Sequence, residues 1–260
     1  MALVETEAIV LRTYNLAEAD KICVCLSRAA GLIRGVASGS RRLKTRFGAA
    51  LEPFTLINLT YYQKENQELV AFREAEIVRS NFDFLSEPVS LSGLAYMGDL
   101  IVEFSPPYQA NDTLFRMVKA CIEAISASPE DLQLVLRYFE VWILRLEGFL
   151  PDVKRCAECD RVFAGGEPVF IESGQTLRCR SCGSGEGHAL SRNVHTQLLA
   201  SLKLGPAVFA GEARQASPKT KRDLAQLTRQ MIGRALEREL KSRPSYGPVT
   251  TGTTPEDTRN

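Results

Sequence analysis

Four of the seven cysteines form two Cys-x-x-Cys pairs, a spacing that places two sulfurs on one tight turn. The pairs are Cys156 with Cys159 and Cys179 with Cys182, and 19 residues separate them. Two such pairs facing each other complete a tetrahedral shell of four sulfurs, which suits Zn²⁺ and leaves no open position for a water nucleophile. The spacing therefore predicts a structural zinc site rather than a catalytic one.

The segment around these cysteines is poor in residues that could build a core. Its 27 residues from Cys156 to Cys182 hold six large apolar side chains. Full burial contributes about 1.5–3 kcal/mol for each of them, whereas ordering the backbone costs roughly 1–2 kcal/mol per residue. A structural zinc ion adds about 10–16 kcal/mol. We therefore expect residues 153–187 to form a metal-dependent module.

Two disulfides or four idle thiols are the alternatives to a metal. Disulfides are disfavoured because the N-terminus lacks a secretory signal and because the other three cysteines, Cys23, Cys25 and Cys121, lie in apolar surroundings typical of reduced thiols. His188 lies close enough in sequence to be an alternative ligand, but four cysteines already fill the shell.

The first 80 residues alternate between segments rich in β-branched and aromatic residues and clusters of turn-forming residues. Five strands in this length predict a small closed barrel, and the OB-fold is the commonest five-stranded barrel that binds oligonucleotides. The expected strands are Ala8–Leu11, Ile22–Leu26, Leu32–Ala37, Phe54–Tyr62 and Leu69–Val78.

A one-signed stretch of charge lies within this predicted barrel. No carboxylate occurs between Asp20 and Glu52, although protein surfaces normally mix both signs. The alternative is a solvated loop, but the missing counter-charges favour a polyanion. The cations assigned to nucleic-acid phosphates are Lys21, Arg34, Arg41, Arg42, Lys44 and Arg46, and Arg28 lies in the same stretch.

Aromatic side chains in this region could stack on the bases of a single strand. Tyr61 and Tyr62 are adjacent in a strand and point to opposite faces, so at most one of them is expected to be buried. We assign Tyr61 to base stacking; Tyr14, Phe47 and Tyr62 are further candidates, with barrel core as the alternative, and Phe72 is assigned to the core.

From Pro88 onward the apolar period changes from that of strands to that of helices. Helices are expected from Pro88, from about Asp112 and over Leu132–Leu146, the last after an N-cap at Ser128. Two more are expected at Ser191–Leu204 and from Ser217. The fold class is therefore α+β: a barrel over residues 1–80, a helical domain over 81–243 carrying the inserted module, and a disordered tail over 244–260.

The remaining sequence contains no phosphate-binding loop, no nucleophile elbow and no cluster of histidines with carboxylates. A hydrolase or nuclease that uses the cysteine-bound metal is disfavoured because the sulfur shell is saturated. No apolar run reaches membrane-spanning length. These observations favour a non-enzymatic protein of the cytoplasm.

The chain resembles the RecO family of bacterial recombination mediators over nearly its whole length. Residues 7–11 and 18–21 resemble the first hairpin of the family. Residues 31–37 and the basic stretch that runs to 48–54 resemble its signature loop and fourth strand. Residues 137–140 and 146–151, just before the first cysteine pair, resemble its central helix, and 240–243 match its C-terminal pattern.

This resemblance implies an OB-fold, a helical domain and a zinc module, in a protein of the bacterial cytoplasm that associates with the nucleoid. It also implies binding of single- and double-stranded DNA, annealing of complementary strands, and loading of the RecA recombinase, with RecR, onto DNA coated by single-stranded-DNA-binding protein. Some family members lack the four cysteines, so the metal is expected to support the fold. Arg137 matches a basic position that captures the tail of the single-stranded-DNA-binding protein; a salt bridge within the bundle is the alternative. The competing functional hypothesis is a zinc-containing protein-interaction adaptor with incidental DNA contact.

Overall fold

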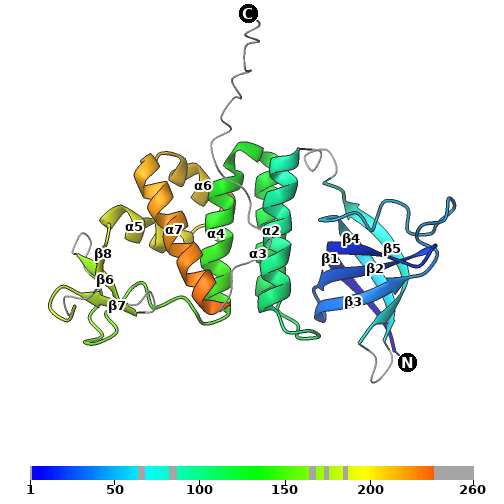
Figure 1. Cartoon of the computed structure of the whole chain (residues 1–260), viewed down its shortest axis with the longest axis horizontal. Coiled ribbons are helices and arrows are strands. Elements are labelled where there is room, and N and C mark those ends of the chain that lie inside the picture. Colours follow the sequence, from blue (N-terminus) through cyan, green and yellow to red (C-terminus); the bar gives the residue numbers. More distant parts are fainter. Residues whose placement is uncertain are drawn as a thin grey trace, which may run out of the picture.

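The protein is described here by a computed structural model that covers residues 2–63, 68–81, 87–163, 168–172, 176–183 and 187–236. A β-barrel lies at one end of the molecule, a small cysteine-containing module at the other, and a group of helices between them (Figure 1). The predicted tail, 244–260, and the motif at 240–243 lie outside the described residues.

Five strands close into a barrel in the order β1-β2-β3-β5-β4, which confirms the predicted N-terminal barrel. All neighbouring strands pair antiparallel except β3 and β5, which pair in parallel through Gly35 and Val70. The strands are β1 (Ala2–Leu16), β2 (Asp20–Ser27), β3 (Gly31–Ala37), β4 (Leu56–Gln63) and β5 (Val70–Arg79).

The first strand is much longer than the predicted Ala8–Leu11, because only its centre is apolar on both faces. Ala8 and Val10 point into the barrel interior, whereas Ile9 and Leu11 belong to a cluster shared with the helices. Residues that flank this centre, such as Glu5, lie on the exposed wall and break the hydrophobic pattern. The continuous apolar runs in β1 and β2 therefore mark the wall of the barrel that packs on the helical domain.

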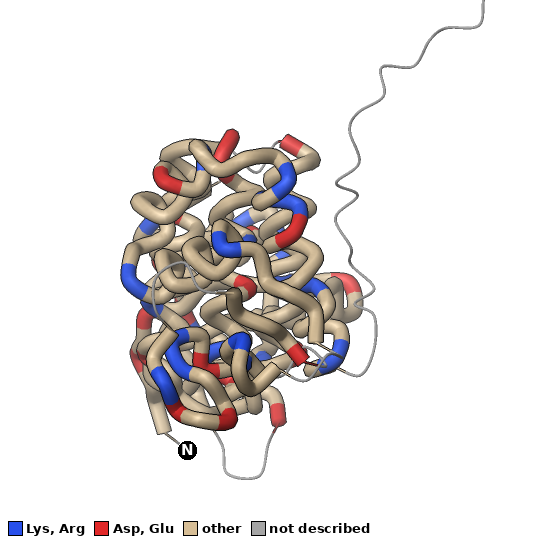
Figure 2. The backbone as a smooth tube through the Cα atoms, turned by 90° about the vertical axis from the view of Figure 1, so that its left-hand side faces the viewer, with Lys and Arg blue, Asp and Glu red and all other residues tan. Residues whose placement is uncertain are grey.

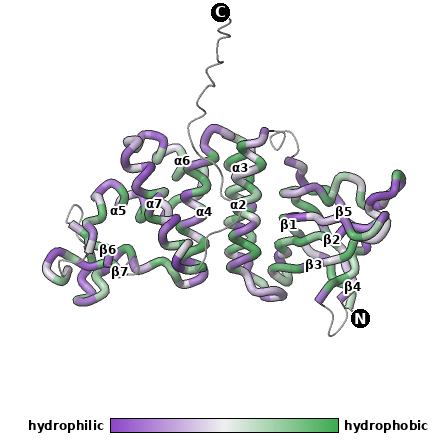
Figure 3. Tube along the Cα trace, viewed as in Figure 1, coloured by the Kyte–Doolittle hydropathy of each residue, from purple (hydrophilic) through white to green (hydrophobic). Residues whose placement is uncertain are grey.

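Six α-helices follow the barrel within the described residues, and Figure 3 shows apolar residues running along α2, α3 and α4. The helix over Leu132–Leu146 has the predicted bounds, but Ser128 makes no side-chain cap and precedes a short 3₁₀ turn instead. The helices are α2 (Pro88–Phe104), α3 (Asp112–Ala127), α4 (Leu132–Leu146), α5 (Arg192–Ser201), α6 (Pro206–Arg214) and α7 (Pro218–Ala235).

Helix α6 has no counterpart among the expected elements. It spans only nine residues, and its buried side chains are Phe209, Ala210 and Ala213. Too few apolar positions are present to establish a period of 3.6, and Gly205 with Pro206 gives a start signal only. Among the described residues, no helix combines the length and apolar composition needed to cross a bilayer.

The barrel and the helical domain are joined by backbone contacts as well as by apolar packing. The Tyr108 amide donates a hydrogen bond of 3.0 Å to the Leu32 carbonyl at the edge of β3. Gly31 has a positive φ of 67°, and a Cβ there would lie 1.9 Å from the Gln109 carbonyl oxygen. A side chain at position 31 would therefore push the linking segment away from the barrel.

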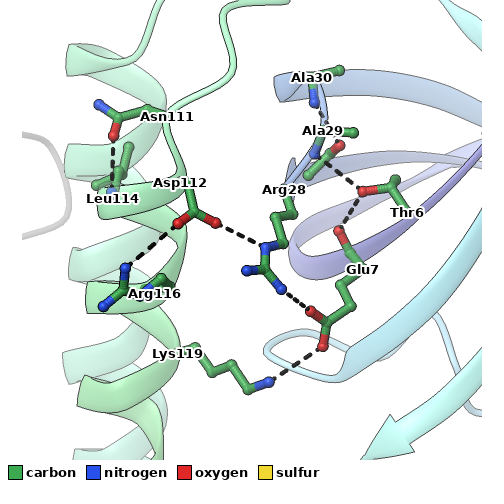
Figure 4. A network of polar contacts seen from close by, with 11 residues as sticks. Thr6, Glu7, Arg28, Ala29, Ala30, Asn111, Asp112, Leu114, Arg116 and Lys119 are labelled. Carbon is green, nitrogen blue, oxygen red and sulfur yellow. Dashed lines mark hydrogen bonds and ion pairs between the residues drawn. The ribbon is translucent and has the colours of Figure 1, made fainter.

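Ion pairs surround this junction (Figure 4). The Arg28 guanidinium contacts Glu7 on β1 at 2.9 Å and Asp112 on α3 at 2.8 Å, and Lys119 on α3 also contacts Glu7 at 3.2 Å. Burial raises the pKa of Glu7, but hydrogen bonds from Lys119 and Arg28 outweigh it, so this pKa lies below its ordinary value of 4.5. The charged network therefore stabilises the barrel–helix contact most when Glu7 is ionised.

We predict that Glu7→Gln reduces the acid sensitivity of the fold. A depressed carboxyl pKa stabilises the folded state above the unfolded value of 4.5, and this contribution is lost as the pH falls through the folded pKa. The variant should lower the melting temperature by about 2–4 °C at pH 7, because the network is partly exposed, and by less at pH 3. Thermal melts at both pH values measure this. Glu5→Gln, an exposed neighbour on β1, is the control, and equal effects from both variants would contradict the prediction.

Candidate nucleic-acid interface and metal centre

The four predicted cysteine ligands come together in the structure. Their sulfur atoms all lie within 4.8 Å of one another, and His188 lies exposed on β8, outside this group. Two tight turns hold the sulfurs: the Asp160 amide donates to the Cys156 carbonyl at 2.9 Å, and the Gly183 amide donates to the Cys179 carbonyl at 2.8 Å. The turns are carried by a three-stranded sheet of β6 (Val169–Glu172), β7 (Thr176–Cys179) and β8 (His188–Leu190).

The geometry of these sulfurs fits a tetrahedral metal ion. Zinc–sulfur bonds of about 2.3 Å place the sulfurs of a tetrahedron roughly 3.8 Å apart. The Sγ atoms of Cys159 and Cys179 are 3.9 Å apart, and the Cys179 amide donates a hydrogen bond of 3.4 Å to the Cys156 sulfur. Such an amide contact favours the thiolate form. The four cysteines can therefore hold a metal ion.

The pKa values of these thiols differ because the groups are so close. A hydrogen bond with the Ser181 hydroxyl, supported by the Cys182 amide and opposed by burial, lowers the pKa of Cys179 to about 6. Contacts with the sulfurs of Cys159 and Cys179 raise the pKa of Cys182 to about 12. Four adjacent thiols cannot all ionise against their mutual repulsion, and a divalent cation between them removes that penalty.

The cysteine module, residues 153–190, is attached to the helical domain by α5. A His195 ring nitrogen lies 2.7 Å from the Val153 carbonyl oxygen, and the His195 ring meets Phe163 edge-on at 5.6 Å. Val169 and Leu177 belong to the same apolar cluster as the helical core. The module therefore has a fixed position at the end of the molecule opposite the barrel (Figure 1).

The predicted basic stretch forms a loop that crosses from β3 to β4 (residues 38–55). We refer to this segment as the cationic loop, because it contains Arg41, Arg42, Lys44 and Arg46, and all four of these cations lie exposed. No carboxylate of the described residues forms an ion pair with any of them. Their charge is thus available to an external anion.

The cationic loop is anchored to the turn between β1 and β2 and to the interior of the barrel. The Arg41 amide donates to the Ala19 carbonyl at 3.0 Å, and its guanidinium donates to the Ala17 carbonyl at 3.0 Å. Arg46 packs its guanidinium over the ring of Phe47, at 5.1 Å from the ring centroid. Phe47 itself is buried in the barrel, so this apolar residue holds the loop while the cationic residues remain exposed.

The two acids that bound the carboxylate-free stretch fold back onto it. Asp20 accepts a hydrogen bond from the Gly39 amide at 2.8 Å, and Glu52 lies 3.6 Å from the Lys21 ammonium. The side chain of Lys21 is only 22% exposed, so this predicted phosphate contact is partly neutralised within the chain. Arg34 is exposed on β3 and lies close to Tyr108. It precedes the cationic loop in the sequence and is not part of it.

The prediction that Tyr61 stacks on bases is wrong, because its ring is 0% exposed and fills the barrel interior. Strand alternation requires that only one of Tyr61 and Tyr62 is buried, and the register of β4 with β1 decides which. Phe47 and Phe72 are also core residues. Among the aromatic candidates, Tyr14 is 50% exposed, and Tyr62 is half-buried beneath Arg73.

Arg137 is buried in the helical bundle rather than presented to a partner. Its guanidinium contacts Glu140 at 2.8 Å, and their side chains are 7% and 1% exposed. Glu140 also accepts hydrogen bonds from Tyr96 on α2, at 2.8 Å, and from Thr228 on α7. This placement corresponds to the alternative of a salt bridge within the bundle and does not support Arg137 as an exposed partner contact.

The opposite charge gathers on another wall of the barrel, which sequence reasoning missed. Four glutamates and the side chains of Asn58 and Thr60 line a groove of about 460 Å³ between β1, β4 and β5. The signal was present, because acids spaced two apart in a strand share one face. The glutamates are Glu5, Glu7, Glu74 and Glu76. Glu7 is paired with Arg28 and Lys119, so the other three glutamates supply most of the negative charge of this wall, which would repel a polyanion.

The module end of the molecule carries both signs of charge. Lys and Arg are interspersed there with Asp and Glu (Figure 2). Within the module, Arg155 pairs with Asp160 at 3.0 Å, and Arg178 contacts Glu172 at 3.3 Å. Arg155 and Arg178 therefore have carboxylate partners, unlike the cations of the cationic loop.

Comparison with known proteins identifies the family. The model for the N-terminal domain of recombination protein O matches residues 1–81, and the model for its C-terminal domain matches residues 85–244. The chain belongs to the RecO family. Its members are DNA repair proteins, so the chain is placed in DNA repair and recombination.

Individual RecO proteins align over long stretches of the chain. The DNA repair protein RecO of Koribacter versatilis is 35% identical over 166 residues, covering 62% of this chain and 67% of that protein. The DNA repair protein RecO of Anaeromyxobacter sp. strain K is 28% identical over 245 residues, covering 94% of this chain and 95% of that protein. The RecO protein of Pelotomaculum thermopropionicum is 29% identical over 93% of both chains.

Proposed function

We propose that this chain is a recombination mediator that binds single- and double-stranded DNA through its barrel and anneals complementary strands. In the same role it helps to load the RecA recombinase, together with RecR, onto DNA coated by single-stranded-DNA-binding protein, in the bacterial cytoplasm. Membership of the RecO family supports this role. The ion held by the four cysteines is proposed to be structural Zn²⁺, with no part in the chemistry of DNA.

The observation that carries this proposal is the cationic loop. Four exposed cations stand on a closed barrel and pair with no described carboxylate, so a phosphate backbone can neutralise them. Phosphate contacts fix position without reading bases, and binding is therefore proposed to be independent of sequence. Annealing follows because a surface that neutralises two strands lowers their mutual repulsion.

A salt-dependent titration of the full chain tests the proposal. Four phosphate contacts to single-stranded DNA predict a slope of log affinity against log salt near −0.7 × 4, or about −3. The affinity for a labelled oligonucleotide should therefore fall about 50-fold between 50 and 200 mM salt. Fluorescence anisotropy at four or five salt concentrations gives the slope. Weak binding that does not respond to salt would instead favour the protein-interaction adaptor.

A further inference from the structure

The cationic loop carries an apolar side chain, Leu43, that packs into neither apolar cluster of the described residues. Leu43 has a relative exposure of 106%, whereas the next most exposed large apolar residues in the described part of the chain, Val89 and Val208, reach 58% and 57%. The other apolar residues of the same loop are buried and anchor it: Phe47, Ala50, Leu51 and Phe54.

A single exposed leucine on a protein surface ordinarily needs no explanation. Leu43 differs because cations flank it on both sides and because the backbone beneath it is fixed by the hydrogen bond from the Arg42 amide to the Gly39 carbonyl, at 3.2 Å. A ligand that satisfies both features must present negative charge and an apolar face within a few ångströms. An unpaired nucleotide does so, since its phosphate is anionic and its base has an open π-face.

We propose that Leu43 packs against the faces of unpaired bases while the flanking cations hold the phosphates. This inference rests on the proposed function and adds a contact that discriminates between forms of DNA. In a duplex the base faces are covered by stacking, and a leucine reaches them only by wedging a base step open, which costs unstacking energy. Leu43 is therefore a determinant of preference for single strands over duplexes.

Truncation of this side chain in the full-length protein is the experiment. Leu43→Ala should weaken binding of a single-stranded oligonucleotide about five-fold, from the lost apolar contact, and binding of the matching duplex by less than about two-fold. The salt slope should not change, because Leu43 releases no counterions. Val208→Ala, which truncates an exposed apolar residue on α6, is the matched control and should leave both affinities unchanged.

A second variant gives a direct readout of the contact. Leu43→Trp should preserve or strengthen binding to single strands, and its fluorescence should be quenched on addition of the oligonucleotide as the indole stacks on a base. The inference is overturned if Leu43→Ala binds single strands as well as the parent, if it loses single strands and duplexes equally, or if the tryptophan remains unquenched in a saturated complex.

Two further outcomes distinguish a failure of this inference from a failure of the proposed DNA-binding function. If the parent protein binds no oligonucleotide at low salt, the proposed function itself fails. If the parent binds DNA and Leu43→Ala differs from it only in binding vesicles of anionic phospholipid, Leu43 is a lipid contact, and the inference fails while the proposed function stands.

Discussion

Removal of the metal is expected to unfold the cysteine module while the barrel stays folded. Within the described residues of the module, only a few apolar side chains are buried, among them Val153, Phe163, Val169 and Leu177. Their burial supplies about 1.5–3 kcal/mol each, which is less than the roughly 1–2 kcal/mol for every residue that the module must order. A structural metal contributes about 10–16 kcal/mol, so its loss exceeds what the remaining contacts hold together.

This prediction is tested by metal analysis together with hydrogen exchange. The protein should contain one metal ion per chain, and Cys179→Ser or a strong chelator should remove it and abolish protection of the amides of β6 and β7. Cys121→Ala, a buried cysteine of α3 outside the cage, should retain the metal. Because the barrel lies at the other end of the molecule (Figure 1), the salt slope for DNA should persist after metal removal. Unchanged exchange in the metal-free module would show that the ion is not structural.

Replacing the four cations of the cationic loop with alanine is expected to abolish salt-dependent DNA binding. A slope near −3 corresponds to a counterion-release contribution of roughly four-thousand-fold in affinity at 50 mM salt, relative to 1 M. Without the four cations, the slope should approach zero and the affinity at 50 mM should fall by about that factor. The same anisotropy titration measures both quantities.

The control removes the same charge from elsewhere in the chain. Arg192, Lys203, Lys219 and Arg222 are exposed cations of the helical domain, and none of them forms an ion pair with a described carboxylate. Their joint replacement should leave the slope unchanged. A melting curve checks the loop variant, because Arg46 also donates a long hydrogen bond of 3.4 Å to the Phe72 carbonyl. Equal losses in both variants would mean that net charge, and not the loop, holds DNA.

The elements of the chain were largely predictable because their signals are local. The five strands, the helix at Leu132–Leu146 and the Cys-x-x-Cys pairs each follow from neighbouring residue types, and the structure confirms them. The long ends of β1 and the short helix α6 were not predictable, since polar wall positions and a nine-residue helix give weak periodicity.

The roles of single side chains required the tertiary structure. Tyr61 is buried because the pairing of β4 with β1 turns that face inward, and a shift by one residue would have buried Tyr62 instead. Glu140 reaches Arg137 by helical spacing, but the bond from Thr228 comes from 88 residues away along the chain. Such long-range partners decide whether a charge is free or neutralised.

The sequence by itself determined the sulfur shell, the fold class and the positive charge of the stretch between Asp20 and Glu52, because ligand spacing, hydrophobic period and composition are properties of adjacent residues. Only the tertiary structure decided which cations remain available. Folding brings the Glu52 carboxylate to the Lys21 ammonium, whereas the side chains of Arg42 and Lys44 pair with no described carboxylate. The physical reason is that the energy of a charge depends on the groups within a few ångströms of it, and chain topology sets those neighbours.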